Sequence, residues 1–187
     1  MKQKQLALIL TMLLCMIFRA AAQSPQYYCD IRNHSFVSSQ VYEFDIFLTR
    51  SGATPLELAN YQAAIQLNPL IVAGGTLTPS IVAGSSQLNA SQQPTHIAFD
   101  ASTQTLKIAP QAPPRTLNPG NTSTTNGTLI PGDEGYRVCR VQLNSNLPFG
   151  QAAMNPVWNF DVDPYNTVVS AFTGSETAKV KIGRAHV

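Results

Sequence analysis

The chain has 187 residues, of which only 12% are charged, together with 13 prolines and 11 glycines. This composition excludes a helical bundle, because helices need many helix-forming residues and few breakers. Between its two unusual ends, the chain has the length of one domain, which is enough to bury a substantial core.

Residues 1–22 have the pattern of a secretory signal peptide. Lys2 and Lys4 precede an apolar run over residues 6–18, and a run of three alanines ends at Ala22. A basic head, an apolar segment of this length and small residues before the cleavage site are typical of export signals. The run is shorter than the roughly 20 residues that a membrane span needs. We therefore expect cleavage after Ala22 and a secreted or surface-exposed chain without a membrane span.

The positive charge of the chain belongs to its ends. The whole sequence has 12 basic and 10 acidic residues. Lys2, Lys4 and Arg19 leave with the signal peptide and Arg184 lies in the last segment, so eight basic residues remain against ten acidic ones. The body has no basic stripe that could neutralise phosphates, so nucleic acid is not an expected partner.

The first half of the body predicts two strands with alternating faces. Segments 41–50 and 60–69 alternate apolar and polar residues, which is the pattern of a half-buried strand. Between them, residues 54–59 (TPLELA) could form one helical turn. Glu43 and Asp45 are predicted to face away from the core. The predicted inward side chains are Tyr42, Phe44, Ile46 and Leu48, followed by Tyr61, Ala63, Ile65 and Leu67.

The second half predicts a hairpin and further short strands. Segments 95–100 and 104–110 form the hairpin around Ala101-Ser102, and later strands are expected near residues 136–143, 157–162 and 167–172. Their predicted inward side chains are Ile97, Phe99, Leu106, Ile108, Cys139, Val141, Leu143, Trp158, Phe160 and Val162. Short strands at this spacing, separated by turns, predict an all-β antiparallel β-sandwich. The polar stretch 111–132 is expected to be a long loop, either functional or mobile.

The order of these segments resembles a known fold family. The segments VYEFDIFL, YQAAIQLNPLIV, HIAFDASTQTLKIA and VWNF, with the turn at Asn68-Pro69, are similar to cohesin-like modules, relatives of bacterial carbohydrate-binding sandwiches. The resemblance covers most of residues 23–181 and implies a jelly roll of about nine strands. More narrowly, ELANYQAAIQLNP, LNASQQP and PYNTVVSAF resemble the N-terminal module of bacterial secreted proteins that end in a type IX secretion sorting domain.

The motifs do not favour an enzyme. Hydrolysis needs two carboxyl groups at a set separation or a nucleophile beside a base, and no motif such as G-x-S-x-G is present. His34 and His96 are the credible histidines, and His96 is most simply an outward strand residue. We expect no catalytic residue and no cofactor.

A calcium site is the one metal hypothesis. Asp161 and Asp163 flank Val162, so both carboxylates would project from one strand face, and Asp133-Glu134 lies in a loop. Calcium prefers clustered oxygen ligands, but this ligand set is incomplete, and a pair of solvated acids is the alternative.

Sugar binding would require exposed aromatic rings. The single Trp158 is in phase with inward residues, so a core position is favoured over a binding platform. Tyr27, Tyr28 and Tyr165 remain candidates for ligand-facing rings.

Cys29 and Cys139 remain after signal removal, and two alternatives stay open for them. An even number of cysteines in an exported chain permits a disulfide, whereas two separate buried thiols would pack as small apolar groups.

The last six residues, 182–187, back-translate to the start of a common sequencing adapter, which suggests that the chain is a fragment of a longer gene product. Its first functional hypothesis is a non-catalytic interaction or structural module of a secreted or cell-surface bacterial protein. The alternative is a carbohydrate-binding module joined to a downstream enzyme domain. The expected partner is accordingly a protein domain or an extracellular polysaccharide.

Overall fold

The computed structural model describes residues 25–71, 74–109, 116–117, 123–124, 127–150, 152–161, 164–172 and 179–181. The predicted signal peptide (1–22), the C-terminal segment 182–187, Val162 and Asp163 lie outside this part of the chain.

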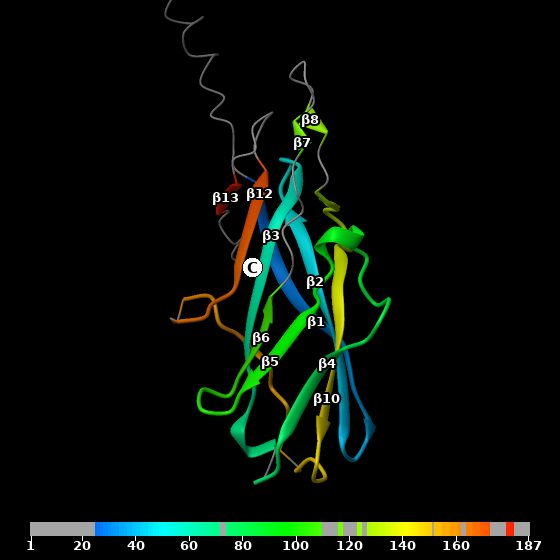
Figure 1. Ribbon diagram of the computed structural model, residues 1–187, viewed down its shortest axis with the longest axis vertical. Helices are drawn as coiled ribbons and strands as arrows, with labels where there is room; N and C mark the ends of the chain where they lie inside the picture. The colour runs from blue at the N-terminus through cyan, green and yellow to red at the C-terminus, as the bar shows by residue number, and fades with distance from the viewer. Residues whose placement is uncertain are drawn as a thin grey trace, which may run out of the picture.

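One layer is a four-stranded antiparallel sheet in the order β1-β2-β10-β4. It joins distant parts of the sequence, because β10 lies between the early strands β2 and β4 (Figure 1). The strands are β1 (Gln26–Ser38), β2 (Val41–Ser51), β4 (Leu77–Ile81) and β10 (Tyr136–Ser145).

The second layer is built around the long strand β3 (Leu56–Gln66). Its main path is β13-β12-β3-β6-β5, and two short strands, β9 and β11, also pair with β3. The other strands are β5 (His96–Asp100), β6 (Thr105–Ala109), β9 (Leu129–Ile130), β11 (Val157–Trp158), β12 (Val168–Phe172) and β13 (Lys179–Lys181). A separate pair, β7 (Thr116–Leu117) and β8 (Ser123–Thr124), and two short 3-10 helices, η1 (Pro69–Ile71) and η2 (Ala90–Gln92), complete the described elements.

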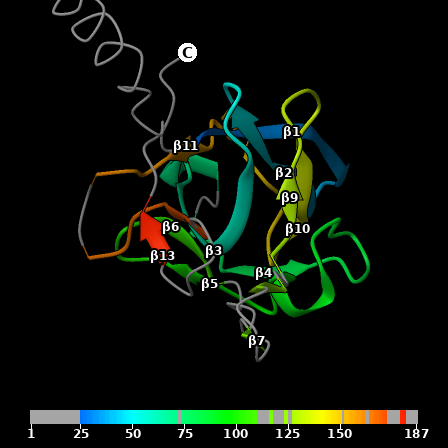
Figure 2. The same cartoon turned by 90° about the horizontal axis from the view of Figure 1, so that it is seen from above.

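The chain repeatedly crosses between these layers, which Figure 2 shows from one end. The main paths of the two sheets contain nine strands, and every described pairing is antiparallel. The predicted all-β antiparallel sandwich of about nine strands is therefore confirmed. Within the described residues, no helix is long and apolar enough to cross a membrane.

The core lies between the sheets and follows the predicted alternation. Inward side chains of β2 and β3 are almost completely buried, as are Leu106 and Ile108 of β6, while Ile97 and Phe99 of β5 are half-buried against them. Burying each large apolar side chain contributes about 1.5–3 kcal/mol. The largest fully buried side chains of the two central strands are Phe44, Ile46, Leu48, Leu56, Leu58, Tyr61 and Ile65.

The prediction of a helical turn over residues 54–59 is wrong. Leu56 already belongs to β3, where Leu56 and Glu57 pair with Ile130 and Leu129 of β9. Pairing with β9 satisfies the backbone, and burial of Leu56 and Leu58 favours an extended conformation over an isolated turn.

Candidate functional site on the outer face of the four-stranded sheet

Asp45 lies at the centre of the outer face of the β1-β2-β10-β4 sheet. The register places Arg32 of β1 opposite Asp45 on one side and Arg140 of β10 opposite it on the other. The sequence predicted a solvent-facing Asp45, but its side chain is 0% exposed. The prediction of its direction is correct and that of its exposure is wrong, because other side chains and a loop cover it.

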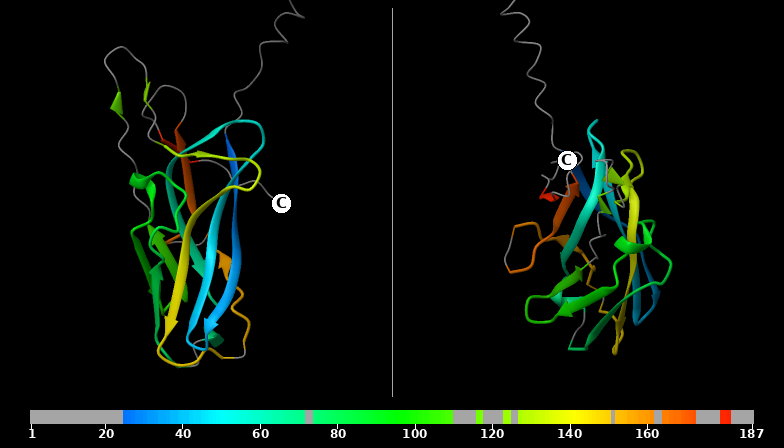
Figure 3. Two further views of the ribbon diagram at one scale, coloured as in Figure 1. Left: turned by 90° about the vertical axis from the view of Figure 1, so that its right-hand side faces the viewer. Right: turned by 45° about the horizontal axis from the view of Figure 1, so that its top comes forward.

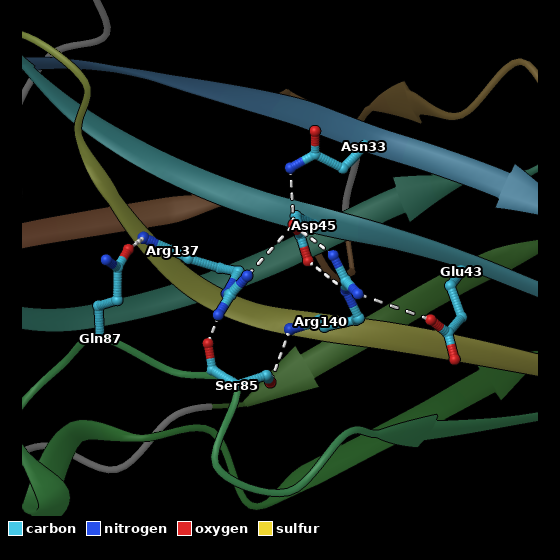
Figure 4. A network of polar contacts seen from close by, with 7 residues as sticks. All are labelled: Asn33, Glu43, Asp45, Ser85, Gln87, Arg137 and Arg140. Carbon is cyan, nitrogen blue, oxygen red and sulfur yellow. Dashed lines mark hydrogen bonds and ion pairs between the residues drawn. The ribbon is translucent and has the colours of Figure 1, made fainter.

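Four hydrogen-bond donors surround the Asp45 carboxylate (Figure 4). Arg140 donates from Nε to Oδ1 at 2.7 Å and from Nη2 to Oδ2 at 3.0 Å, the bidentate geometry that suits a guanidinium and a carboxylate. Asn33 Nδ2 donates to Oδ2 at 2.8 Å, and Arg137 Nη1 approaches the same oxygen at 3.4 Å. Both carboxylate oxygens are therefore occupied.

Irregularities in the two neighbouring strands position these donors. In a regular strand, residues three apart lie on opposite faces, yet Arg137 and Arg140 both reach the outer face. A register shift between Arg137 and Cys139 adds one residue to β10, so that Val138 and Cys139 are both buried.

The second irregularity lies in β1, where the register shifts between Arg32 and Ser35. Asn33, within this shift, has a φ of 53°, a left-handed conformation that asparagine tolerates better than most residues. This backbone conformation accompanies the contact of the Asn33 amide with Asp45.

The loop that follows β4 closes the site from the other side. Its backbone continues to pair with β10, because Val82 N donates to Arg140 O and Gln87 N donates to Arg137 O. Ser85 accepts from Arg137 Nε on its carbonyl oxygen at 2.6 Å and from Arg140 N on its hydroxyl at 2.9 Å. The loop thereby fixes the Arg137 side chain and helps to cover Asp45.

The positive and negative charges of this site differ in how deeply they are buried. Burial alone would raise the pKa of Asp45, but hydrogen bonds from Arg140 and Asn33 and the charges of Arg140 and Arg137 lower it below its usual value. The Arg137 and Arg140 side chains are 31% and 34% exposed, whereas Glu43, which lies 3.9 Å from Arg140, is 18% exposed. Positive charge therefore faces solvent while its balancing carboxylates lie beneath or beside it.

A third arginine extends this surface across β1. The Arg32 guanidinium lies 4.3 Å from the centre of the Phe47 ring, a cation–π contact, and donates to Asp30 Oδ2 and to the Glu134 carbonyl oxygen. We call the outward side chains of Arg32, Phe47, Arg137 and Arg140 the arginine face. Its guanidinium groups can bind carboxylate or carbonyl oxygens of a partner. A deprotonated, fully hydrogen-bonded Asp45 cannot act as a general acid at neutral pH.

The three candidate tyrosines do not form a binding platform. Tyr27 shares the inward face of β1 with Cys29 and is buried in the core, so its prediction as a surface ring is wrong. Tyr28 is half-buried on the outer face beside Thr49. Tyr165 is half-buried on the other sheet, where its hydroxyl donates to the Ile108 carbonyl oxygen at 3.0 Å. Trp158 pairs with Ile65 and packs against the core, as predicted.

The structure does not join Cys29 and Cys139 by a disulfide, which contradicts the disulfide alternative. Cys29 lies opposite Leu48 and Cys139 opposite Ile46, on the two sides of β2. The strands of the two cysteines are separated by two strand spacings of about 4.8 Å each. Together these spacings exceed the Cα separation of about 7 Å that a disulfide can bridge. Burial and the nearby Asp45 charge raise the pKa of the Cys139 thiol to about 12.

The predicted metal and histidine candidates remain apart. Asp161 is exposed in a bend after β11 rather than on a strand, and its proposed partner Asp163 is outside the described residues. Asp133 and Glu134 are exposed in the loop before β10. His34 and His96 are exposed, on β1 and β5. In the part of the chain that the structure describes, no group of three His, Cys, Asp or Glu side chains could hold a metal ion.

Comparisons with known proteins find no matching family model and no matching curated protein. Two similar solved structures come from Acetivibrio cellulolyticus. A chain from the crystal structure of a type II cohesin–X-dockerin complex, an N-terminal interface mutant, has a TM-score of 0.47 and 10% identity, over 87% of this chain and 94% of that chain. The second type II cohesin module of the adaptor scaffoldin ScaA has a TM-score of 0.43 and 8% identity, over 87% of each chain.

Proposed function

We propose that residues 23–181 form a non-catalytic interaction module of an exported protein, and that the arginine face binds a partner protein domain. The observation that carries this proposal is the difference in exposure between the charged side chains. Arg137 and Arg140 are about one-third exposed, while Asp45 beneath them is 0% exposed. A partner surface with carboxylate side chains would complement this arrangement.

The arginine side chains are already held in fixed positions by neighbouring residues, which supports a binding role. Binding immobilises flexible side chains at a cost of about 0.5–1.5 kcal/mol each. Arg137 and Arg140 are already fixed by Asp45 and Ser85, and Arg32 by Asp30 and Phe47. Much of this cost is therefore met during folding, and arginine is among the residues that contribute most to protein interfaces.

Export is part of the proposal and rests on the sequence of residues 1–22, whose basic head, apolar run and terminal alanines match a signal peptide. The resemblance to the N-terminal modules of type IX secretion substrates supports the same localisation.

Carbohydrate binding is the second candidate, because one hollow combines an aromatic ring with polar groups. A space of about 250 Å³ on the second sheet is lined by residues that include Tyr165, Lys107, Asn159 and Gln66. A tyrosine ring beside amide side chains suits a sugar. However, Lys107 Nζ lies 5.7 Å from the centre of the Tyr165 ring and occupies part of its surroundings.

The test compares two charge-removing variants. Arg140→Gln removes a charge from the arginine face but keeps an amide donor for Asp45, and Lys107→Gln removes a charge from the other sheet. The immobilised full chain is exposed to secreted proteins of its source organism, and retained proteins are quantified at increasing salt. We expect a retained protein whose binding is lost in Arg140→Gln, kept in Lys107→Gln and weakened by salt.

Equal retention by the wild-type chain and Arg140→Gln would contradict the proposal. Parallel depletion assays on cellulose, chitin and mannan test the second candidate. Binding to a polysaccharide that Lys107→Gln abolishes and Arg140→Gln does not would favour the carbohydrate function instead.

A further inference from the structure

One end of the sandwich is made from segments without charged side chains. Residues 33–42, 66–81 and 141–150 contain no Asp, Glu, Lys or Arg. Protein surfaces normally carry about 25–35% of these residues, so their absence from three separate segments is unusual. The segments include the β1–β2 turn, the connection from β3 to β4 and the chain after β10.

Backbone and side-chain hydrogen bonds join these segments at the end opposite to the start of β3 (Figure 3). Ser145 N donates to Gln40 O at 2.9 Å, and Phe149 N donates to Ser39 O at 2.7 Å. Gly150 N donates to Ile71 O at 3.0 Å. Segments far apart in the sequence thus form one continuous surface, which we call the uncharged end.

Exposed apolar side chains gather on the uncharged end. Phe36, Val37, Leu70 and Leu147 are each between 44% and 70% exposed. Phe36 is held in place by ring contacts, with centroid distances of 4.9 Å to Tyr42 and 5.6 Å to Phe149. A clustered apolar surface of this kind marks an interaction site more often than single exposed residues do.

A hollow lies beside the exposed Leu70. It has a volume of about 360 Å³, and its lining includes Pro69, Leu77, Phe99 and Gln104. A cavity of about 150 Å³ is enough to admit benzene, so this hollow can admit a leucine side chain. The uncharged end therefore presents a protruding apolar side chain next to a hollow whose lining includes the apolar side chains of Leu77 and Phe99.

We propose that the uncharged end binds the same end of a second copy of the chain. In a two-fold symmetric contact, each surface must complement itself. Leu70 of one copy can enter the hollow of the other copy, and the reverse contact follows from the symmetry. A charged partner would bury its charges here without an opposite charge, which is costly, whereas a second uncharged end leaves none unpaired. This contact leaves the arginine face free, so it is independent of the proposed function.

The experiment measures self-association of the full chain by sedimentation equilibrium. We expect a monomer–dimer equilibrium whose dissociation constant stays the same or decreases as NaCl rises from low values to about 1 M, because the contact contains no charges. The double variant Val37→Ser/Leu70→Ser should weaken association at least about tenfold. The matched control Leu129→Ser changes an exposed leucine of β9 at the opposite end and should leave association unchanged.

Both substituted positions of the double variant are exposed, and circular dichroism checks that the variant keeps the β-sheet signal of the wild-type chain. A chain that stays monomeric up to about 1 mM would overturn the inference, since weaker association is below useful affinity. So would a dimer that salt dissociates, or one that Leu129→Ser disrupts as strongly as the double variant. Retention of a different protein through Val37 and Leu70, without self-association, would also overturn it.

Discussion

At the scale of single residues, two buried hydroxyl groups among the described side chains have no hydrogen-bond partner: those of Thr49 and Tyr61. An unsatisfied buried polar group costs about 1–3 kcal/mol. Thr49→Val keeps the side-chain shape and removes the hydroxyl, so we expect the free energy of unfolding to rise by about 1 kcal/mol. Thr167→Val is the matched control and should lower it, because the Thr167 hydroxyl bonds both N and O of Ala64. Denaturant unfolding of both variants measures the difference, and a loss of stability in Thr49→Val would contradict the prediction.

The Asp45 carboxylate predicts how stability depends on pH. Its pKa is lowered in the folded chain, so it stabilises the fold above the unfolded-state pKa of about 3.9, and this contribution is lost as pH falls below that value. We expect Asp45→Asn to be less stable than the wild-type chain at neutral pH, by about 2 kcal/mol, and its stability to fall less steeply below about pH 4. Urea unfolding at a series of pH values tests this. Asp100, whose pKa is also lowered, is present in both proteins. If the stability of Asp45→Asn fell with decreasing pH as steeply as that of the wild-type chain, Asp45 would not be the cause of the pH dependence.

At the scale of elements, the turn before β10 depends on Gly135. Its φ is +71°, and a Cβ there would lie 2.6 Å from the Leu48 carbonyl oxygen and would also collide with the Thr49 hydroxyl. We expect Gly135→Ala to lower the free energy of unfolding by at least about 2 kcal/mol. Gly84→Ala is the control, because Gly84 has a φ of +69° but no atom within 4 Å of its Cβ position. Equal losses in both variants, measured by thermal unfolding, would show that only backbone strain matters at Gly135.

The elements also show what alternation can and cannot predict. It correctly placed the core residues of β2, β3 and β6, because a period of two distinguishes the faces of a regular strand. It missed the burial of Asp45, since alternation contains no information on the loop around Ser85 that covers the face. One signal was present in the sequence: Arg137 and Arg140 are three residues apart, so both could face outward only if β10 contained a bulge.

The helical turn predicted at residues 54–59 failed for a related reason. Its extended conformation depends on pairing with β9, some 70 residues further along the chain, which local sequence cannot reveal. The disulfide alternative required the register of three strands, because only the position of β2 between Cys29 and Cys139 rules it out. The hairpin of residues 95–110 was predicted correctly because its two strands are adjacent in the sequence, whereas the conformation of residues 54–59 depends on a strand that lies far along the chain.

At the scale of the whole molecule, the sandwich has no disulfide between Cys29 and Cys139, so its stability should not depend on reductant. The test uses the full chain carrying Cys15→Ser, which leaves these two thiols. We expect the same thermal midpoint with and without dithiothreitol.

Cys139 is completely buried and its pKa is raised to about 12, so its labelling by a thiol reagent at neutral pH should require unfolding of the chain. Labelling of Cys139 in the folded chain at the rate of an exposed thiol would contradict its burial in the core. A lower midpoint in reductant would contradict the position of β2 between Cys29 and Cys139.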